Sequence, residues 1–204
     1  MLRNPIDAPE NSFGSYLSQI GGISEEDVEN IKEGLRTKKV SKGDILVGIG
    51  DLCRHNFFVE KGLLRSYTIG EDGKEHVIQF APENWFIVDR ASVYFNDPSE
   101  VYIDAVEDSR IVLIDGDFMD RLAKLDGDYA KFNDRLLHNH IRHIHKRLNL
   151  LLGASAEKRY LSFIEMYPDL LLRVPQWMIA SYLGITPESL SRVRKELANK
   201  NFRV

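Results

Sequence analysis

The segment from Gln176 to Lys195, QWMIASYLGITPESLSRVRK, contains side chains that can read the edges of DNA base pairs. An arginine can donate two parallel hydrogen bonds to guanine, and a glutamate can accept one from cytosine. Arg192 and Glu188 are four residues apart, so they share one face if the segment is helical. The DNA-contacting residues that we expect here are Gln176, Thr186, Glu188, Ser189, Ser191, Arg192 and Lys195. The alternative for each is an ordinary solvated position on a helix.

The apolar residues of this segment are spaced as two crossing helices require. They are Ile179, Leu183, Ile185, Leu190 and Val193, with the small Ala180 at the close approach. Gly184 suits a left-handed turn between the helices, Thr186 can cap the second helix, and Pro187 suits its first position. This spacing predicts a helix-turn-helix whose second helix enters the major groove. An ordinary helical hairpin in a protein core is the alternative.

Charge is distributed unevenly along the 204 residues. The chain has a net charge of −4, yet the part after residue 172 has six Lys or Arg residues against two Glu residues. An acidic chain of this kind does not coat nucleic acid indiscriminately, but its basic end can contact a phosphate backbone. With 43% hydrophobic and 28% charged residues, the composition is globular and leaves room for two compact domains.

A long helix is predicted upstream, over residues 121–153, and Gly153 ends it. Its apolar residues step alternately by four and three, which is the seam of a coiled-coil contact. The seam consists of Leu137, Ile141, Ile144, Leu148 and Leu151. The simplest partner is the same helix of a second subunit, which predicts a homodimer. Packing of this helix on its own domain is the alternative.

The remainder of the chain predicts a β-rich domain behind a short helical start. Residues 1–37 read as helical, with Ser24 as a cap before Glu25, Glu26 and Asp27. Short β-rich runs then alternate with turns over residues 38–115, and Glu71–Lys74 reads as a hairpin tip. The fold class is therefore α+β, with an antiparallel β-roll of jelly-roll type, a long dimerisation helix and a winged-helix-like C-terminal domain. We expect domains at 1–120, 121–153 and 154–204.

This order of parts resembles the CRP/FNR superfamily of bacterial transcription regulators. The matching stretches are Lys42-Gly43-Asp44, Val59-Glu60-Lys61-Gly62-Leu63-Leu64-Arg65 and Asp72-Gly73-Lys74-Glu75, besides the helix-turn-helix. The resemblance implies a regulator that binds double-stranded DNA as a dimer, with RNA polymerase and a small-molecule effector as candidate partners. Glu188 and Arg192 fall where the family has base-reading residues, but Pro187 replaces a base-reading Arg of some members. The sequence ends at Val204, so we expect the family's β-wing to be short or absent.

The cassette that holds cyclic AMP in some members of this family is altered here. Val88 and Asp89 replace its Gly-Glu pair, and Ser99 and Glu100 replace its Arg and its Ser or Thr. A carboxylate about 4 Å from a phosphodiester costs about 4 kcal/mol at an effective dielectric constant near 20. Arg90 is expected to pair with Asp89 rather than to substitute for the missing Arg. We therefore expect no binding of cyclic AMP and no cofactor, although a pocket including these five positions could hold another effector.

Other chemistries are weakly supported. Cys53 is the only cysteine, which excludes a cysteine-ligated iron–sulfur cluster and leaves a redox sensor or an inert thiol. A group of histidines, His138, His140, His143 and His145, lacks the i,i+4 spacing of helical metal ligands. The better interpretation of this group is a pH-sensitive or polar flank of the dimer seam. We expect no metal site and no catalytic residues.

The expected location is the cytoplasm, because no apolar run is long enough for a membrane span and no secretory signal is visible. Two rival functions stay open. The first is a ligand-binding or scaffold protein whose degenerate helix-turn-helix no longer binds DNA. The second is a β-barrel metalloenzyme, which requires bound metal.

Overall fold

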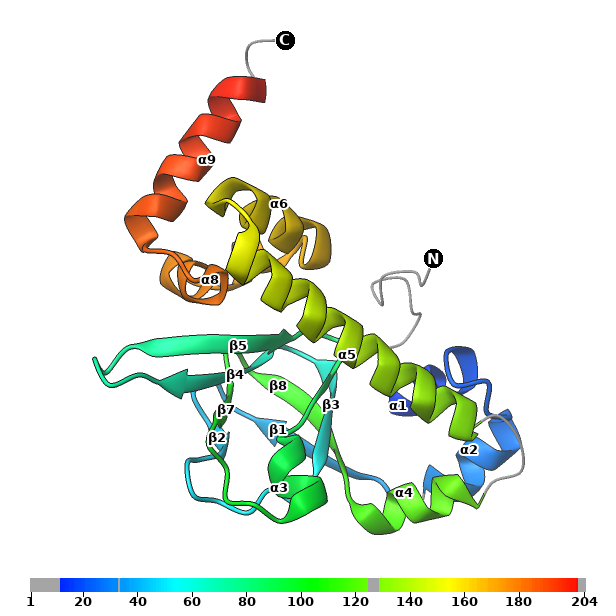
Figure 1. Cartoon of the computed structure of the whole chain (residues 1–204). Coiled ribbons are helices and arrows are strands. Elements are labelled where there is room, and N and C mark those ends of the chain that lie inside the picture. The colour runs from blue at the N-terminus through cyan, green and yellow to red at the C-terminus, as the bar shows by residue number, and fades with distance from the viewer. Residues whose placement is uncertain (1–11, 33, 125–128, 202–204) are drawn as a thin grey trace. The chain divides into compact units, whose positions relative to one another are not determined.

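The computed structural model describes residues 12–32, 34–124 and 129–201 (Figure 1). The strands are β1 (Arg36–Val40), β2 (Ile45–Val47), β3 (Asn56–Lys61), β4 (Leu64–Ile69), β5 (Glu75–Ala81), β6 (Phe86–Ile87), β7 (Tyr102–Ala105) and β8 (Ser109–Ile114). The helices are α1 (Phe13–Gln19), α2 (Glu25–Lys32), α3 (Arg90–Phe95), α4 (Gly116–Ala123), α5 (Tyr129–Gly153), α6 (Ala156–Met166), α7 (Leu170–Arg173), α8 (Gln176–Leu183) and α9 (Pro187–Asn201).

The chain forms two compact units. One contains the chain up to Thr68 together with Ile78–Leu137, and the other contains Ile69–Val77 together with the chain from His138 onward. The division lies within α5, whereas we expected residues 121–153 to form a segment of their own. The helical region expected from residue 121 is also divided, because α4 ends at Ala123 and α5 begins at Tyr129.

Among the described residues, the strands form two four-stranded sheets with the orders β1-β8-β3-β6 and β2-β7-β4-β5. Pairing is antiparallel, for example between Arg36 and Leu113 in β1 and β8. This arrangement confirms the predicted antiparallel roll. Strand β1 was not among the predicted β-rich runs, because its sequence RTKKV is exposed at its first four positions and lacks apolar alternation.

Two hydrophobic cores stabilise the first unit. One contains apolar residues from both sheets, including Phe57, Ile103 and Ile111. The other packs α1, α2 and α4 against Phe58, Val112 and Ile114 of the sheet β1-β8-β3-β6. The short helices at the start of the chain therefore cover one sheet of the roll.

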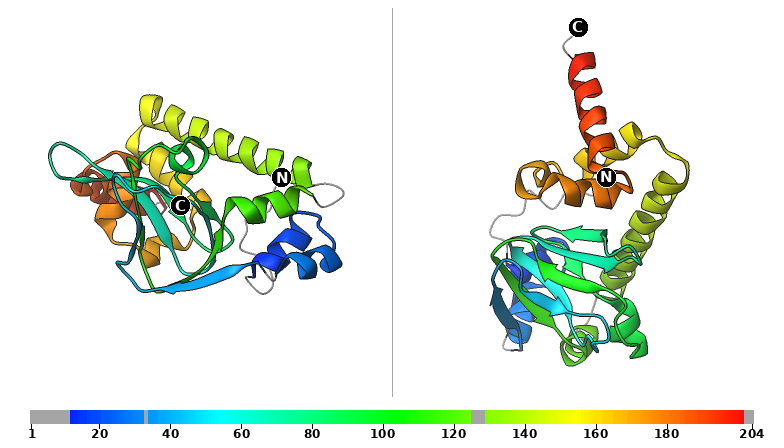
Figure 2. Two further views of the ribbon diagram at one scale, coloured as in Figure 1. Left: turned by 90° about the horizontal axis from the view of Figure 1, so that it is seen from below. Right: turned by 90° about the vertical axis from the view of Figure 1, so that its left-hand side faces the viewer.

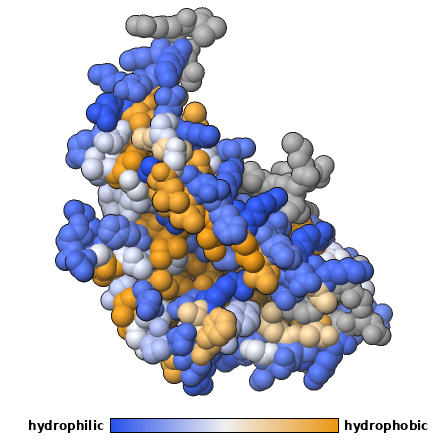
Figure 3. All heavy atoms as spheres, viewed as in Figure 1, coloured by the Kyte–Doolittle hydropathy of each residue, from blue (hydrophilic) through white to orange (hydrophobic). Residues whose placement is uncertain are grey.

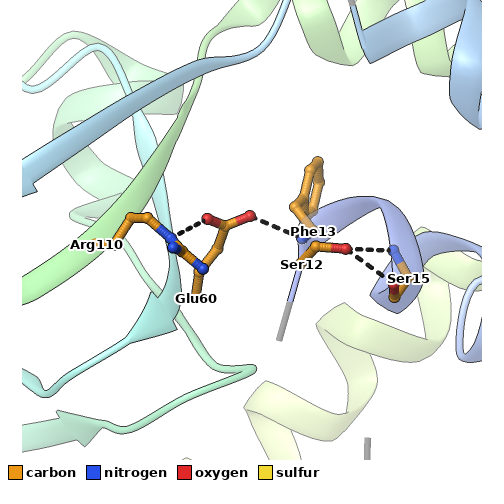
Figure 4. Close-up of polar contacts among 5 residues, drawn as sticks. All are labelled: Ser12, Phe13, Ser15, Glu60 and Arg110. Atoms are coloured by element: carbon orange, nitrogen blue, oxygen red, sulfur yellow. Dashed lines mark hydrogen bonds and ion pairs between the residues drawn. The ribbon is translucent and has the colours of Figure 1, made fainter. Parts of the chain in front are cut away.

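The buried carboxylate of Glu60 attaches α1 to strand β3 (Figure 4). One of its oxygens accepts a hydrogen bond from the backbone N–H of Phe13 at 3.1 Å, and the other accepts one from Nε of Arg110 at 2.8 Å. Ser12 caps the same helix by accepting from the backbone N–H of Ser15. A buried carboxylate needs such partners, because each oxygen that leaves water must be hydrogen-bonded again.

The seam predicted on α5 forms an exposed apolar stripe. Leu137, Ile141, Ile144 and Leu148 are between 37% and 52% exposed, and apolar surface runs along this helix in Figure 3. The fifth predicted residue, Leu151, is half-buried and lines a small cavity beside α6 and α8. Leu152, which is 78% exposed, continues the stripe in its place.

Candidate nucleic-acid interface

The turn between α8 and α9 has the conformation that the sequence predicts. Gly184 ends α8 with φ 65° and ψ 39°, and its backbone N–H bonds back to the carbonyls of Ala180 and Ser181. Thr186 then begins α9, because its hydroxyl accepts from the backbone N–H of Ser189 and its carbonyl accepts from that of Leu190. The left-handed Gly184 and the cap at Thr186 therefore set the direction in which α9 leaves the turn (Figure 2).

The helix pair rests on a common apolar core. Of the residues predicted to face between the helices, five are buried: Ile179, Ala180, Leu183, Leu190 and Val193. Ile185 is half-buried. Aromatic rings from α6 and its end extend this core, since the rings of Phe163 and Tyr167 lie 5.4 and 5.8 Å from that of Tyr182. The predicted helix-turn-helix is therefore present, and it packs on α6.

The exposed face of α9 brings together Glu188, Ser191, Arg192 and Lys195. Their spacing of three and four residues places them on the side of the helix opposite Leu190 and Val193. Hydrogen bonds from its own backbone N–H and from the Thr186 hydroxyl lower the pKa of the Glu188 carboxyl. Glu188 is consequently an anionic acceptor at neutral pH, while Arg192 is a cationic donor one turn away.

Two of the predicted DNA-contacting residues are already engaged in the start of α9. The hydroxyls of Thr186 and Ser189 lie 3.3 Å apart, and Ser189 is half-buried. Thr186 is therefore the N-cap, which satisfies the backbone N–H of Ser189, and the Ser189 hydroxyl is bonded to that of Thr186.

Gln176 lies at the first position of α8 and is hydrogen-bonded to Arg194 of α9. The distance from the Arg194 Nη1 to the Gln176 Oε1 is 2.5 Å, and both residues are exposed. This bond uses one of the two lone pairs of the Gln176 side-chain oxygen and orients the amide, whose NH₂ group can donate outward. Arg194 was not among the predicted site residues, because no local pattern relates two positions 18 residues apart.

The altered cassette consists of α3 and the residues on either side of it. Asp89 caps α3 by accepting from the backbone N–H of Ser92 at 3.3 Å. The expected ion pair between Asp89 and Arg90 is absent from the described contacts. The guanidinium of Arg90 lies instead 5.6 Å from the ring centre of Tyr94, and Val88 is half-buried.

The position that would need a cation for cyclic AMP is closed by backbone contacts. Ser99 is 2% exposed, and its hydroxyl donates to the carbonyl of Val101. Its backbone N–H donates to the carbonyl of Asp51, and its own carbonyl accepts from Gly50, both at 2.8 Å. Glu100 beside it is exposed. The residue types and contacts at these two positions offer a phosphate no guanidinium.

A buried cation of the same unit, Arg65 of β4, is already paired. It faces Asp104 of β7 in the strand register and binds it through two hydrogen bonds of 2.8 and 2.9 Å. Its guanidinium also lies 4.2 Å from the ring centre of Tyr67. The pair therefore ties two strands of the roll together, and an anionic ligand would have to compete with Asp104 for Arg65.

The structure also shows the surroundings of Cys53 and of His143, one of the four histidines of the predicted group. Burial raises the pKa of the Cys53 thiol, whose Sγ lies 3.3 Å from the carbonyl oxygen of His55, so the thiolate is disfavoured. Burial and the nearby Arg142 and Lys146 lower the pKa of His143. The described part of the chain contains no cluster of three potential metal ligands. It also contains no helix long and apolar enough to span a membrane.

The chain is similar to a known domain family, to known regulatory proteins and to solved structures. A family described as the cyclic nucleotide-binding domain matches residues 37–126. The regulatory protein HlyX of Actinobacillus pleuropneumoniae is 30% identical over 181 residues, which are 81% of this chain and 72% of HlyX. The anaerobic regulatory protein of Pasteurella multocida is 28% identical over 82% of this chain, but the chain spans only 64% of that protein's length. The solved structure of FixK2 from Bradyrhizobium japonicum has a TM-score of 0.68 at 21% identity, covering 82% of this chain and 86% of FixK2.

Proposed function

The chain belongs to the CRP/FNR family of transcription regulators, and from this membership we propose that it acts as a sequence-specific DNA-binding homodimer on an inverted-repeat site. The observation that supports the proposal most directly is the exposed face of α9. There Glu188 and Arg192 lie one turn apart on a capped helix whose opposite side is buried in the helix-turn-helix core. Such a face suits hydrogen bonding to cytosine and guanine in the major groove.

Dimerisation would occur through the exposed stripe on α5. Four of its residues were predicted from the 3.5-residue spacing, and Leu152 extends it by one further step. Two copies of this stripe bury each other in an isologous contact, which places the two recognition helices about one DNA turn apart, roughly 34 Å. The site is then a palindrome.

The sensor domain would not respond to cyclic AMP. Asp89 is committed to capping α3, Ser99 is committed to backbone contacts, and Glu100 adds a negative charge. An effector, if one binds, is therefore a different molecule. We assign the protein no catalytic role and a place in the cytoplasm, and RNA polymerase is the partner through which a bound regulator would act.

Selection from a randomised duplex library at about 150 mM salt, with and without cyclic AMP, tests the proposal. Enrichment of a palindrome in both arms supports it, and enrichment only with cyclic AMP contradicts the reading of the cassette. The rival scaffold function predicts no enrichment in either arm, and so does a regulator that requires an effector other than cyclic AMP.

The variant Arg192→Ala tests the contact itself on the selected duplex. It should lose about 1–3 kcal/mol of discrimination between the selected duplex and one with its guanines replaced. Lys158→Ala, which removes an exposed cation from α6, is the charge-matched control and should leave that discrimination unchanged. Equal behaviour of the two variants would mean that Arg192 does not read bases.

A further inference from the structure

The tip of the hairpin between β4 and β5 belongs to the same compact unit as the helix-turn-helix. Residues Ile69–Val77 are grouped with the chain from His138 onward, although the 60 residues Ile78–Leu137 separate them in the sequence. Strand β5 is the edge strand of its sheet. An edge strand presents backbone N–H and C=O groups that need partners when they are buried.

The partners of these edge groups come from α8 and α5. The Ser181 hydroxyl accepts a hydrogen bond from the backbone N–H of Val77 at 2.9 Å and donates one to the carbonyl of Glu75 at 2.6 Å. An Nη atom of Arg147 donates to the carbonyl of Val77 at 2.8 Å. Alternate residues of a strand direct their backbone groups to the same side, so residues 75 and 77 both face this contact.

Arg147 also binds α8 directly. The same Nη2 atom donates to the carbonyl of Tyr182 at 3.0 Å, and the guanidinium lies 4.2 Å from the ring centre of Tyr182. Arg147 therefore joins the hairpin tip to the last turn of α8. We call these four hydrogen bonds, made by the side chains of Arg147 and Ser181, the α8 latch.

The latch holds the part of α8 that immediately precedes the turn into α9. Ser181 comes three residues before Gly184, and Tyr182 comes two residues before it. Leu183, the residue between Tyr182 and Gly184, is held as well, because Nη1 of Arg159 in α6 donates to its carbonyl at 3.1 Å. The direction of α9 follows from the end of α8 through this short turn. Any freedom at the end of α8 would have to be lost when α9 docks into a groove, which weakens binding.

We propose that Arg147 and Ser181 are positioning residues for DNA recognition, and that the hairpin tip 69–77 is a structural part of the DNA-reading unit. The inference rests on the proposed function, because it concerns how the same α9 face is aimed. It also extends the DNA-reading unit beyond the expected domain 154–204, to a hairpin more than 75 residues earlier in the chain.

Ser181→Ala in the full chain is the primary test, since it removes two of the four hydrogen bonds and almost no volume. Binding is measured by fluorescence anisotropy to the duplex selected by the wild type and to a scrambled duplex. Affinity for the selected duplex should fall about tenfold, as expected from two net hydrogen bonds. Affinity for the scrambled duplex should be unchanged, because it depends on phosphate charge rather than on the aim of α9.

Three further measurements separate positioning from simple stability. Ser181→Thr keeps the hydroxyl and should restore binding, while Ser162→Ala on α6 is the matched control outside the latch. Arg147→Lys keeps the charge but not the planar fork, and it should weaken specific binding in the same direction as Ser181→Ala. Hydrogen exchange at the Val77 amide should accelerate in Ser181→Ala and not in Ser162→Ala.

Several results would overturn the proposal. Equal loss of affinity for both duplexes would indicate only a smaller folded fraction, and unchanged affinity for both would remove the positioning role. Tighter binding of Ser181→Ala to the selected duplex would mean that the hairpin contact opposes DNA binding and does not favour it. Unchanged exchange at Val77 would show that the latch does not protect this amide. A wild type that selects no duplex would instead refute the proposed function, and the exchange experiment would still test the contact.

Discussion

Substitution of Gly184 by alanine should destabilise the helix-turn-helix by about 1–2 kcal/mol. Gly184 has φ 65°, the left-handed region, where a Cβ atom costs about 1–2 kcal/mol. A Cβ placed there would lie 3.1 Å from the Cδ2 atom of Leu151, so Leu151 would have to move by a few tenths of an ångström. Leu151 lines a cavity of about 30 Å³, which gives its side chain room to move. The backbone conformation therefore sets most of the cost.

Gly153→Ala is the matched control for this prediction. Gly153 is the last residue of α5, its φ is not positive, and a Cβ there would have no atom within 4 Å. Alanine at such a position should stabilise the protein by about 0.4–1 kcal/mol, because it restricts the unfolded chain. The two variants should thus shift the stability in opposite directions.

Urea unfolding followed by circular dichroism, at one fixed protein concentration, measures both variants. The midpoint should fall for Gly184→Ala and stay or rise for Gly153→Ala, with unchanged slopes. Equal stability of the wild type and Gly184→Ala would refute the reasoning, because it would mean that residue 184 does not adopt the left-handed conformation in solution.

Three other predictions concern stability, pH and DNA binding. Asp104→Ala breaks the buried pair with Arg65 and should lower the free energy of unfolding by about 3–5 kcal/mol, measured in the same urea assay. The pKa of His143 is lowered, so the stability from its neutral form is complete above its unfolded value near 6.5 and is lost as the pH falls below it. The wild type should therefore lose stability between about pH 7.5 and pH 5.5, and an unchanged profile in His143→Gln would contradict this assignment. Arg194→Ala frees Gln176 and should weaken binding to all duplexes, with the salt slope reduced by about one; a loss confined to the selected duplex would make Arg194 a base reader.

Local patterns in the sequence predicted the elements of the candidate site well. Gly184, Thr186 and the apolar residues around them act over distances of a few residues, so turn and cap chemistry identifies them directly. The same holds for the hairpin tip at Glu71–Lys74 and for the cap at Ser24, whose hydroxyl accepts from the backbone N–H of Asp27.

The structure differs from the sequence-based predictions where distant residues compete for one side chain. The alternating spacing predicted Leu151 as the last seam residue, but Leu151 packs inward beside α6 and α8, and Leu152 is the exposed residue at that end of the stripe. Asp89 was expected to pair with the adjacent Arg90, but the N-terminus of α3 takes its carboxylate instead. Strand β1 was not predicted, because it forms by pairing with β8 and has no apolar pattern of its own.

The sequence by itself determined the family, the order of the elements, the helix-turn-helix and the altered cassette, since each depends on residue types at short and fixed spacings. Only the tertiary structure decided which polar groups meet across the fold. Gln176 meets Arg194, Glu60 meets the start of α1, and Ser181 meets the edge of β5. Such contacts depend on how complete elements pack and on which buried groups still need a partner, and no local spacing encodes that choice.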